Sequence, residues 1–183
     1  PPITCPRTWS AARTAPPSRA AQALAQPGSL LLLGGTALTA ENLEIAGKIA
    51  AHTGCDLLSE WSNARLERGA GRVFVNRVPY PIDIALKVLE PFKRIVLVGA
   101  RAPIGFFAYP DKPASLTRDG AQITTLAHSG ADLTAALEAL RDATGAEDTA
   151  PAHVVEASMP DRPTGPINLD TLAAVIARAI PEQ

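Results

Sequence analysis

The sequence predicts an α/β fold with a doubly wound, mainly parallel sheet flanked by helices. Short apolar segments of strand length alternate with longer segments whose apolar residues recur at helical spacing. The first strand-like segment is almost wholly apolar, which is typical of a strand buried on both faces of a sheet. Strand and helix in alternation is the pattern of parallel βαβ units. We place this domain at residues 28–145.

The first strand-like segment, residues 29–33, is almost wholly apolar and ends at two glycines. Thr39 is the expected N-cap of a helix that ends at Gly54, because glycine readily adopts the left-handed conformation that closes a helix. Small and apolar residues recur on one face of this helix at Leu43, Ala46, Gly47 and Ala50. A second strand is expected at residues 56–59, followed by an irregular segment over residues 62–80.

Two more strands and two more helices complete the predicted domain. Pro81 suits the first turn of a helix, where its missing N–H is not needed, and Pro91 ends that helix. Residues 94–98 and 122–127 are the further strands. The last helix of the domain ends at Gly145 and carries its apolar residues on one face, at Leu133, Ala136, Leu137 and Leu140.

Proline-bearing segments flank the domain on both sides. Residues 1–27 are expected to form a linker with one short helix capped by Ser18. Residues 146–183 are expected to form a proline-rich linker and a final helix capped by Asn168. The apolar stripe of that helix has no obvious partner in the domain and consists of Leu169, Leu172, Ala173 and Ile176. Because the chain also begins at Pro1, we expect it to be a segment of a longer protein.

Composition excludes several functional classes. Apolar residues make up 46% of the chain and the net charge is −1, which argues against disorder and against nucleic acid as the main partner. The longest apolar run, residues 172–177, is too short to cross a membrane, and no signal peptide is visible. Cys5 and Cys55 match no metal or redox spacing, so we expect reduced cysteines in a cytoplasmic protein.

Two glycine-bearing turns come directly after predicted strands, at the end of a parallel sheet where ligands bind. Glycines there let the backbone approach a phosphate, and an arginine can clamp a diphosphate. The residues proposed for cofactor binding are Gly34, Gly35, Thr36, Gly99, Ala100 and Arg101. Neither turn has G-x-G-x-x-G spacing. Tight structural turns, and an ion pair between Arg101 and an acid at a domain boundary, therefore remain open alternatives.

No catalytic constellation is evident elsewhere. The arginine-rich loop at residues 65–72, with Arg77 beyond it, indicates an inter-domain or inter-subunit contact, with anion binding as the alternative. His52, His128 and His153 are interpreted as ordinary histidines. There is no G-x-S-x-G, no H-E-x-x-H and no carboxylate-rich metal cluster. The sequence therefore predicts a scaffold or cofactor-binding domain rather than a complete active site.

Seven short motifs occur in a characteristic order, at residues 31–35, 47–54, 64–72, 77–80, 95–103, 106–110 and 163–166. Together they resemble the middle, Rossmann-like domain of thiamine-diphosphate-dependent enzymes of the acetolactate synthase large-subunit kind. The resemblance covers most of residues 28–183, and residues 1–27 resemble the linker that leaves the pyrimidine-binding domain.

This resemblance implies that the parent is a carboligase or decarboxylase of 2-oxo acids, of either acetolactate synthase or benzoylformate decarboxylase type. The parent would be a homodimer or homotetramer, with thiamine diphosphate and Mg²⁺ held by flanking pyrimidine- and diphosphate-binding domains. No catalytic residue of the family falls in this segment. The alternative is a free-standing Rossmann-like dinucleotide-binding module without a thiamine-dependent parent.

The middle domain of acetolactate synthases also binds FAD, beside an Arg-Phe-Asp-Asp-Arg stretch after a strand-end glycine. In this chain Gly99 and Ala100 are followed by Arg101, which keeps the arginine of that stretch. The remainder of the stretch is replaced by Ala102, Pro103 and Ile104. The resemblance therefore implies at best weak binding of FAD or another adenine nucleotide.

Overall fold

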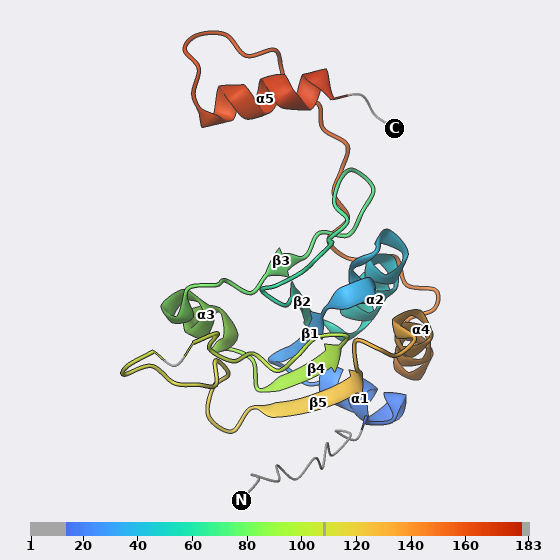
Figure 1. The fold of residues 1–183 in the computed structure, drawn as a ribbon. Helices are drawn as coiled ribbons and strands as arrows, with labels where there is room; N and C mark the ends of the chain where they lie inside the picture. Colours follow the sequence, from blue (N-terminus) through green and yellow to red (C-terminus); the bar gives the residue numbers. More distant parts are fainter. Residues whose placement is uncertain (1–13, 108, 181–183) are drawn as a thin grey trace, which may run out of the picture.

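The computed structural model describes residues 14–107 and 109–180. Its centre is a five-stranded sheet in the order β3-β2-β1-β4-β5, and every neighbouring pair of strands is parallel (Figure 1). The strands are β1 Ser29–Leu33, β2 Asp56–Ser59, β3 Asn76–Arg77, β4 Arg94–Val98 and β5 Gln122–Ala127. The predicted α/β fold with a doubly wound, parallel sheet is confirmed.

The sheet grows in two directions from β1. Leu31 pairs with Leu57 of β2 on one side and with Val96 of β4 on the other. From β1 the chain first builds β2 and β3 on one side, then crosses over to build β4 and β5 on the opposite side. Strand order therefore reverses between β1 and β4, and a ligand crevice is expected where these two strands end.

Helices cover both faces of the sheet. They are α1 Pro17–Leu24, the 3-10 helix η1 Gly35–Leu38, α2 Ala40–Thr53, α3 Ile82–Leu89, α4 Leu133–Thr144 and α5 Leu169–Ala179. Helices α1, α2 and α4 pack on the face that carries Leu31 and Val96. Helix α3 packs on the opposite face, against Leu30, Leu32 and Leu97. Because side chains alternate along a strand, β1 and β4 supply both cores.

The sequence-predicted bounds of β1, β2, β4 and β5 agree with the structure. Two differences occur at short elements. Helix α1 has Pro16, not Ser18, at its N-cap, because Pro17 at the first helical position fits the helical φ and has no N–H to satisfy. Strand β3 lies within the segment expected to be irregular; it has two exposed polar residues and hence no apolar alternation to reveal it.

The packed body extends beyond residues 28–145 on both sides. In α1, Ala20 and Leu24 are fully buried against the sheet. After α4, residues 151–155 run beside residues 71–74, and we call 151–155 the strap. Within it, the N–H of Val155 donates to the Arg72 carbonyl, and the His153 carbonyl accepts from the N–H of Phe74. Part of the expected C-terminal linker is therefore fixed to the body.

Helix α5 stands apart from the sheet, at the red end of the chain (Figure 1). Its N-cap is Asn168, in a capping box: the Thr171 N–H donates to Asn168 Oδ1, and the Asn168 N–H donates to Thr171 Oγ1. None of its residues is buried, and Leu169 is 85% exposed. No helix among the described residues is both long and apolar enough to cross a membrane.

Candidate functional site

The crevice between the carboxyl ends of β1 and β4 brings the two predicted glycine turns together. The N–H of Gly34 donates to the Val98 carbonyl at 3.0 Å, and Leu33 forms an isolated antiparallel bridge with Gly99. Ala100 and Arg101 come directly after Gly99 in the chain. The structure therefore places Gly34, Gly99, Ala100 and Arg101 side by side at the end of the sheet where ligands are expected.

The two glycines are needed for the approach of one backbone turn to the other. A Cβ on Gly34 would lie 2.7 Å from the Gly99 carbonyl oxygen and 2.9 Å from the Ala100 Cα. Gly99 has φ +68°, and a Cβ there would overlap the Gly34 carbonyl oxygen and a methyl group of Leu133. The Cβ positions of the two glycines are therefore occupied by the chain itself.

Gly35 and Thr36 belong to the 3-10 turn that separates β1 from α2. Gly35 has φ +55°, which favours glycine, and only Leu133 lies near its Cβ position. The Thr36 carbonyl accepts hydrogen bonds from Asn42 Nδ2 at 2.9 Å and from Thr39 Oγ1 at 3.2 Å. This turn separates the end of β1 from the start of α2.

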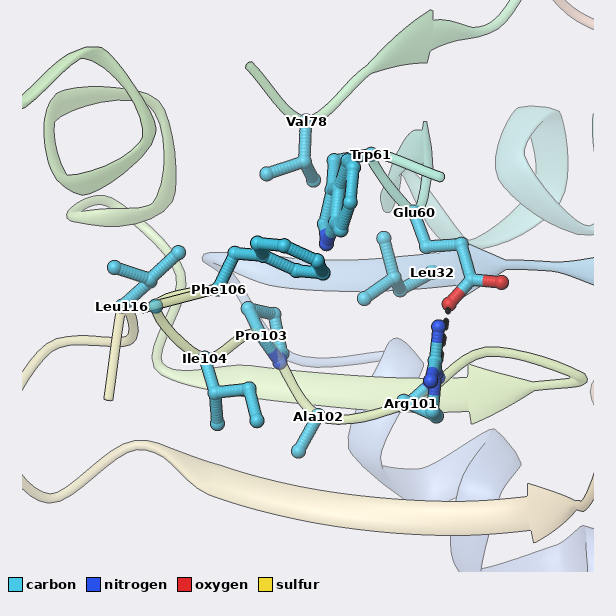
Figure 2. Close-up of a pocket in the computed structure, with 11 residues that line it drawn as sticks. Leu32, Glu60, Trp61, Val78, Arg101, Ala102, Pro103, Ile104, Phe106 and Leu116 are labelled. Atoms are coloured by element: carbon cyan, nitrogen blue, oxygen red, sulfur yellow. Dashed lines mark hydrogen bonds and ion pairs between the residues drawn. The ribbon is translucent and has the colours of Figure 1, made fainter. Parts of the chain in front are cut away.

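Glu60 places a carboxylate over this crevice. It comes directly after β2, its N–H donates to the Leu33 carbonyl, and its side chain is 15% exposed. Its Oε2 accepts the Arg101 N–H at 3.4 Å and lies 3.7 Å from Arg101 Nε (Figure 2). Its Oε1 would lie 2.8 Å from a Cβ on Gly34. Of the two roles considered for Arg101, the structure shows the ion pair with an acid.

A second carboxylate, that of Glu67, occupies the N-terminus of α2. The Ala40 N–H donates to Glu67 Oε2 at 3.0 Å, and the Glu67 N–H donates to the Leu38 carbonyl. Arg65 and Arg72 form ion pairs with the same carboxylate at 2.8 and 3.2 Å. A helix N-terminus at this position holds the phosphate in dinucleotide-binding folds. Here it holds an acidic side chain from the arginine-rich loop.

The arginine-rich loop is therefore largely satisfied within the chain. Arg65 and Arg72 neutralise Glu67. The Arg68 guanidinium lies 5.1 Å from the centre of the Phe74 ring and donates to the Val75 carbonyl at 3.3 Å.

These observations test whether the crevice fits the flavin dinucleotide that the fold family implies. A diphosphate needs free backbone N–H groups and positive charge around it. In this chain the α2 N-terminus is covered by Glu67, and the glycine turns are covered by Glu60 and by each other. The residues present do not fit the diphosphate of FAD or of another dinucleotide.

An apolar cavity of about 260 Å³ opens beside the Glu60–Arg101 pair (Figure 2). Its walls come from β1, from the segments after β2, β3 and β4, and from the loop before β5. They consist of Leu32, Glu60, Trp61, Val78, Arg101, Ala102, Pro103, Ile104, Gly105, Phe106 and Leu116. The Trp61 and Phe106 rings lie edge to face, with their centres 5.1 Å apart. Sequence reasoning missed this cavity and Glu60.

No histidine or cysteine of the described residues lines this cavity. His52 Nδ1 lies 3.3 Å from the Thr149 hydroxyl, and His153 lies in the strap. No three His, Cys, Asp or Glu side chains gather in a way that could hold a metal ion within residues 14–107 and 109–180. Burial raises the pKa of the Cys55 thiol to about 11, which leaves it protonated near neutral pH. Cys5 lies outside the described residues.

The sequence of the chain is similar to part of one known protein. The chain is 38% identical over 160 residues to the putative acetolactate synthase large subunit IlvX of Mycobacterium tuberculosis (strain ATCC 25618 / H37Rv). Over these residues the chain is similar to a segment of an acetolactate synthase-like protein. The similarity covers 85% of this chain but only 30% of that relative, so the segment spans less than a third of the relative's length. No protein-family model matches the sequence. The resemblance predicted from the ordered motifs is confirmed.

Proposed function

We propose that this acetolactate synthase-like segment serves as the central, structural domain of a thiamine-diphosphate-dependent carboligase or decarboxylase that acts on 2-oxo acids. Flanking pyrimidine- and diphosphate-binding domains would hold thiamine diphosphate and Mg²⁺, in a homodimer or homotetramer. The observation that carries the proposal is the 38% identity to one part of an acetolactate synthase-like protein, over 85% of the chain. The all-parallel sheet is the fold that such a central domain requires.

The proposed role is that of a scaffold, without a resident flavin. Two carboxylates stand where a dinucleotide would place its phosphates: Glu60 over the glycine turns and Glu67 on the α2 N-terminus. A diphosphate would have to displace the Glu67 carboxylate from the Ala40 N–H and the Glu60 carboxylate from the Arg101 N–H. Arg101, the residue proposed as a diphosphate clamp, already faces Glu60.

A chimera tests the central-domain role. This chain would replace the matching segment of an acetolactate synthase large subunit, and thiamine-diphosphate-dependent turnover of pyruvate would be measured. We expect a folded chimera that retains turnover, because the cofactor-binding residues lie in the flanking domains. The control is reinsertion of the native segment through the same junctions. An inactive chimera beside an active control would contradict the proposal.

Calorimetry separates the scaffold from a free-standing dinucleotide-binding module. We expect no submicromolar binding of FAD or NAD to the chain, and no turnover of pyruvate or benzoylformate when thiamine diphosphate and Mg²⁺ are added. Tight FAD binding that is lost in Arg101→Ala would instead support the dinucleotide-binding alternative.

A further inference from the structure

We propose that the cavity beside the Glu60–Arg101 pair binds a small, neutral aromatic molecule of one or two fused rings. This site goes beyond the proposed central-domain role. The cavity lies at the reversal of strand order between β1 and β4, which is where open parallel sheets bind ligands. Three observations define its occupant: the cavity's size, the chemistry of its walls and the balance of charge at its mouth.

Size limits the occupant to a compact ring system. The cavity measures about 260 Å³. An apolar cavity of about 150 Å³ accommodates benzene, and sites for drug-sized ligands begin at about 300 Å³. The space here is therefore larger than one six-membered ring needs and too small for a dinucleotide. A bicyclic molecule such as indole matches it.

The walls favour an aromatic occupant. Leu32, Val78 and Leu116 are buried and form an apolar surface from three separate segments of the chain. Trp61 and Phe106 add two aromatic rings to the lining, and Trp61 also packs against the cluster that contains these three residues (Figure 2). Phe106 is 57% exposed, so a ring bound against it would remove apolar surface from water. Aromatic pairs also prefer the offset or edge-to-face arrangements that Trp61 and Phe106 already show.

The charges at the mouth favour a neutral occupant. Glu60 and Arg101 are the charged residues among those that line the cavity, and they face each other. A phosphate or sulfonate would meet the Glu60 carboxylate, and an ammonium group would meet the Arg101 guanidinium. A neutral ring avoids both repulsions and leaves the ion pair in place.

The experiment uses the full chain with the substitution Trp9→Phe, which leaves Trp61 as its only tryptophan. Indole is titrated while the Trp61 side-chain N–H signal is monitored by ¹⁵N NMR, with calorimetry in parallel. We expect a saturable shift of that signal and a Kd on the order of 100 µM, as for a small ligand that binds by apolar contact. ADP should leave the signal unmoved.

Two neighbouring variants locate the site. Phe106→Ala removes a wall and should weaken indole binding about tenfold or more. Phe107→Ala is the matched control, because Phe107 is 58% exposed but does not line the cavity, and it should change binding by less than about twofold. Circular dichroism verifies that both variants are folded.

The proposal is overturned if the Trp61 signal does not shift up to the solubility limit of indole, or if both variants weaken binding equally. Binding of ADP in preference to indole would overturn it as well. The chimera with an acetolactate synthase large subunit does not depend on this cavity, so the two proposals fail independently.

Discussion

Replacing Gly34 by alanine should destabilise the chain strongly, even though its backbone conformation suits any residue. Gly34 has φ −151°, so the left-handed region is not involved. An added Cβ would instead lie 2.7 Å from the Gly99 carbonyl oxygen and 2.9 Å from the Ala100 Cα. Both are backbone atoms of the turn after β4 and cannot rotate away. Overpacking of this kind costs about 3 kcal/mol, which lowers Tm by roughly 6–12 °C in a chain of this size.

Thermal unfolding monitored by circular dichroism measures this effect, with Gly130→Ala as the matched control. Gly130 also has no left-handed φ, and nothing lies within 4 Å of its Cβ position, so its Tm should stay within about 2 °C of the parent. A glycine that served mainly to admit a phosphate would tolerate alanine in the ligand-free chain. A Tm for Gly34→Ala equal to that of the control would therefore refute the view that this turn is structural.

Two further outcomes are expected from the strap and from the buried thiol. Removing residues 161–183 should change Tm by less than about 2 °C, because none of the residues of α5 is buried. Removing residues 151–183 also deletes the strap's hydrogen bonds, which should cost about 2 kcal/mol and lower Tm by roughly 4–8 °C. Equal shifts of Tm for the two truncations would contradict this expectation. In a Cys5→Ser variant, Cys55 should react with a thiol reagent at pH 8 only as the chain unfolds, because burial raises its pKa to about 11. Since the folded pKa is the higher one, the Cys55 contribution to stability is complete below the unfolded pKa of 9.0 and is lost as pH rises towards 11. Rapid labelling of the native chain would show that the thiol is accessible.

The strands of the centre could be predicted because their signals are local. Residues 29–33 and 94–98 are apolar runs that end at glycines, and the structure has strands with these bounds. The positions of the glycine turns result from that topology as well. The side chains that lie at these turns could not be predicted in the same way. Glu60 accepts from Arg101, 41 residues away in the sequence, and Glu67 accepts from Ala40, 27 residues away. Such pairs depend on tertiary packing, and no spacing in the sequence identifies them.

The strap is the other feature that could not be predicted from the sequence. Its contact with the body is an isolated bridge between Val73 and Val154, supported by backbone hydrogen bonds on either side. Backbone groups of any residue can make such bonds, so the side chains carry little signal. One residue of α2 is small enough to allow this contact. It is Gly47, where a Cβ would lie 2.9 Å from the Pro151 side chain. Its place on the apolar face of α2 was predicted, but the segment that packs there was not.

The all-parallel sheet also constrains how the chain folds. No two neighbouring strands can be joined by a hairpin, so every pairing requires a crossover loop to close first. The central pair is among the most distant, because Ser29 of β1 pairs with Arg94 of β4. Helix α2 can form early from local contacts, whereas the second edge of β1 stays unpaired until β4 arrives. Until then β1, with its four consecutive leucines, is a segment through which the nascent chain can aggregate.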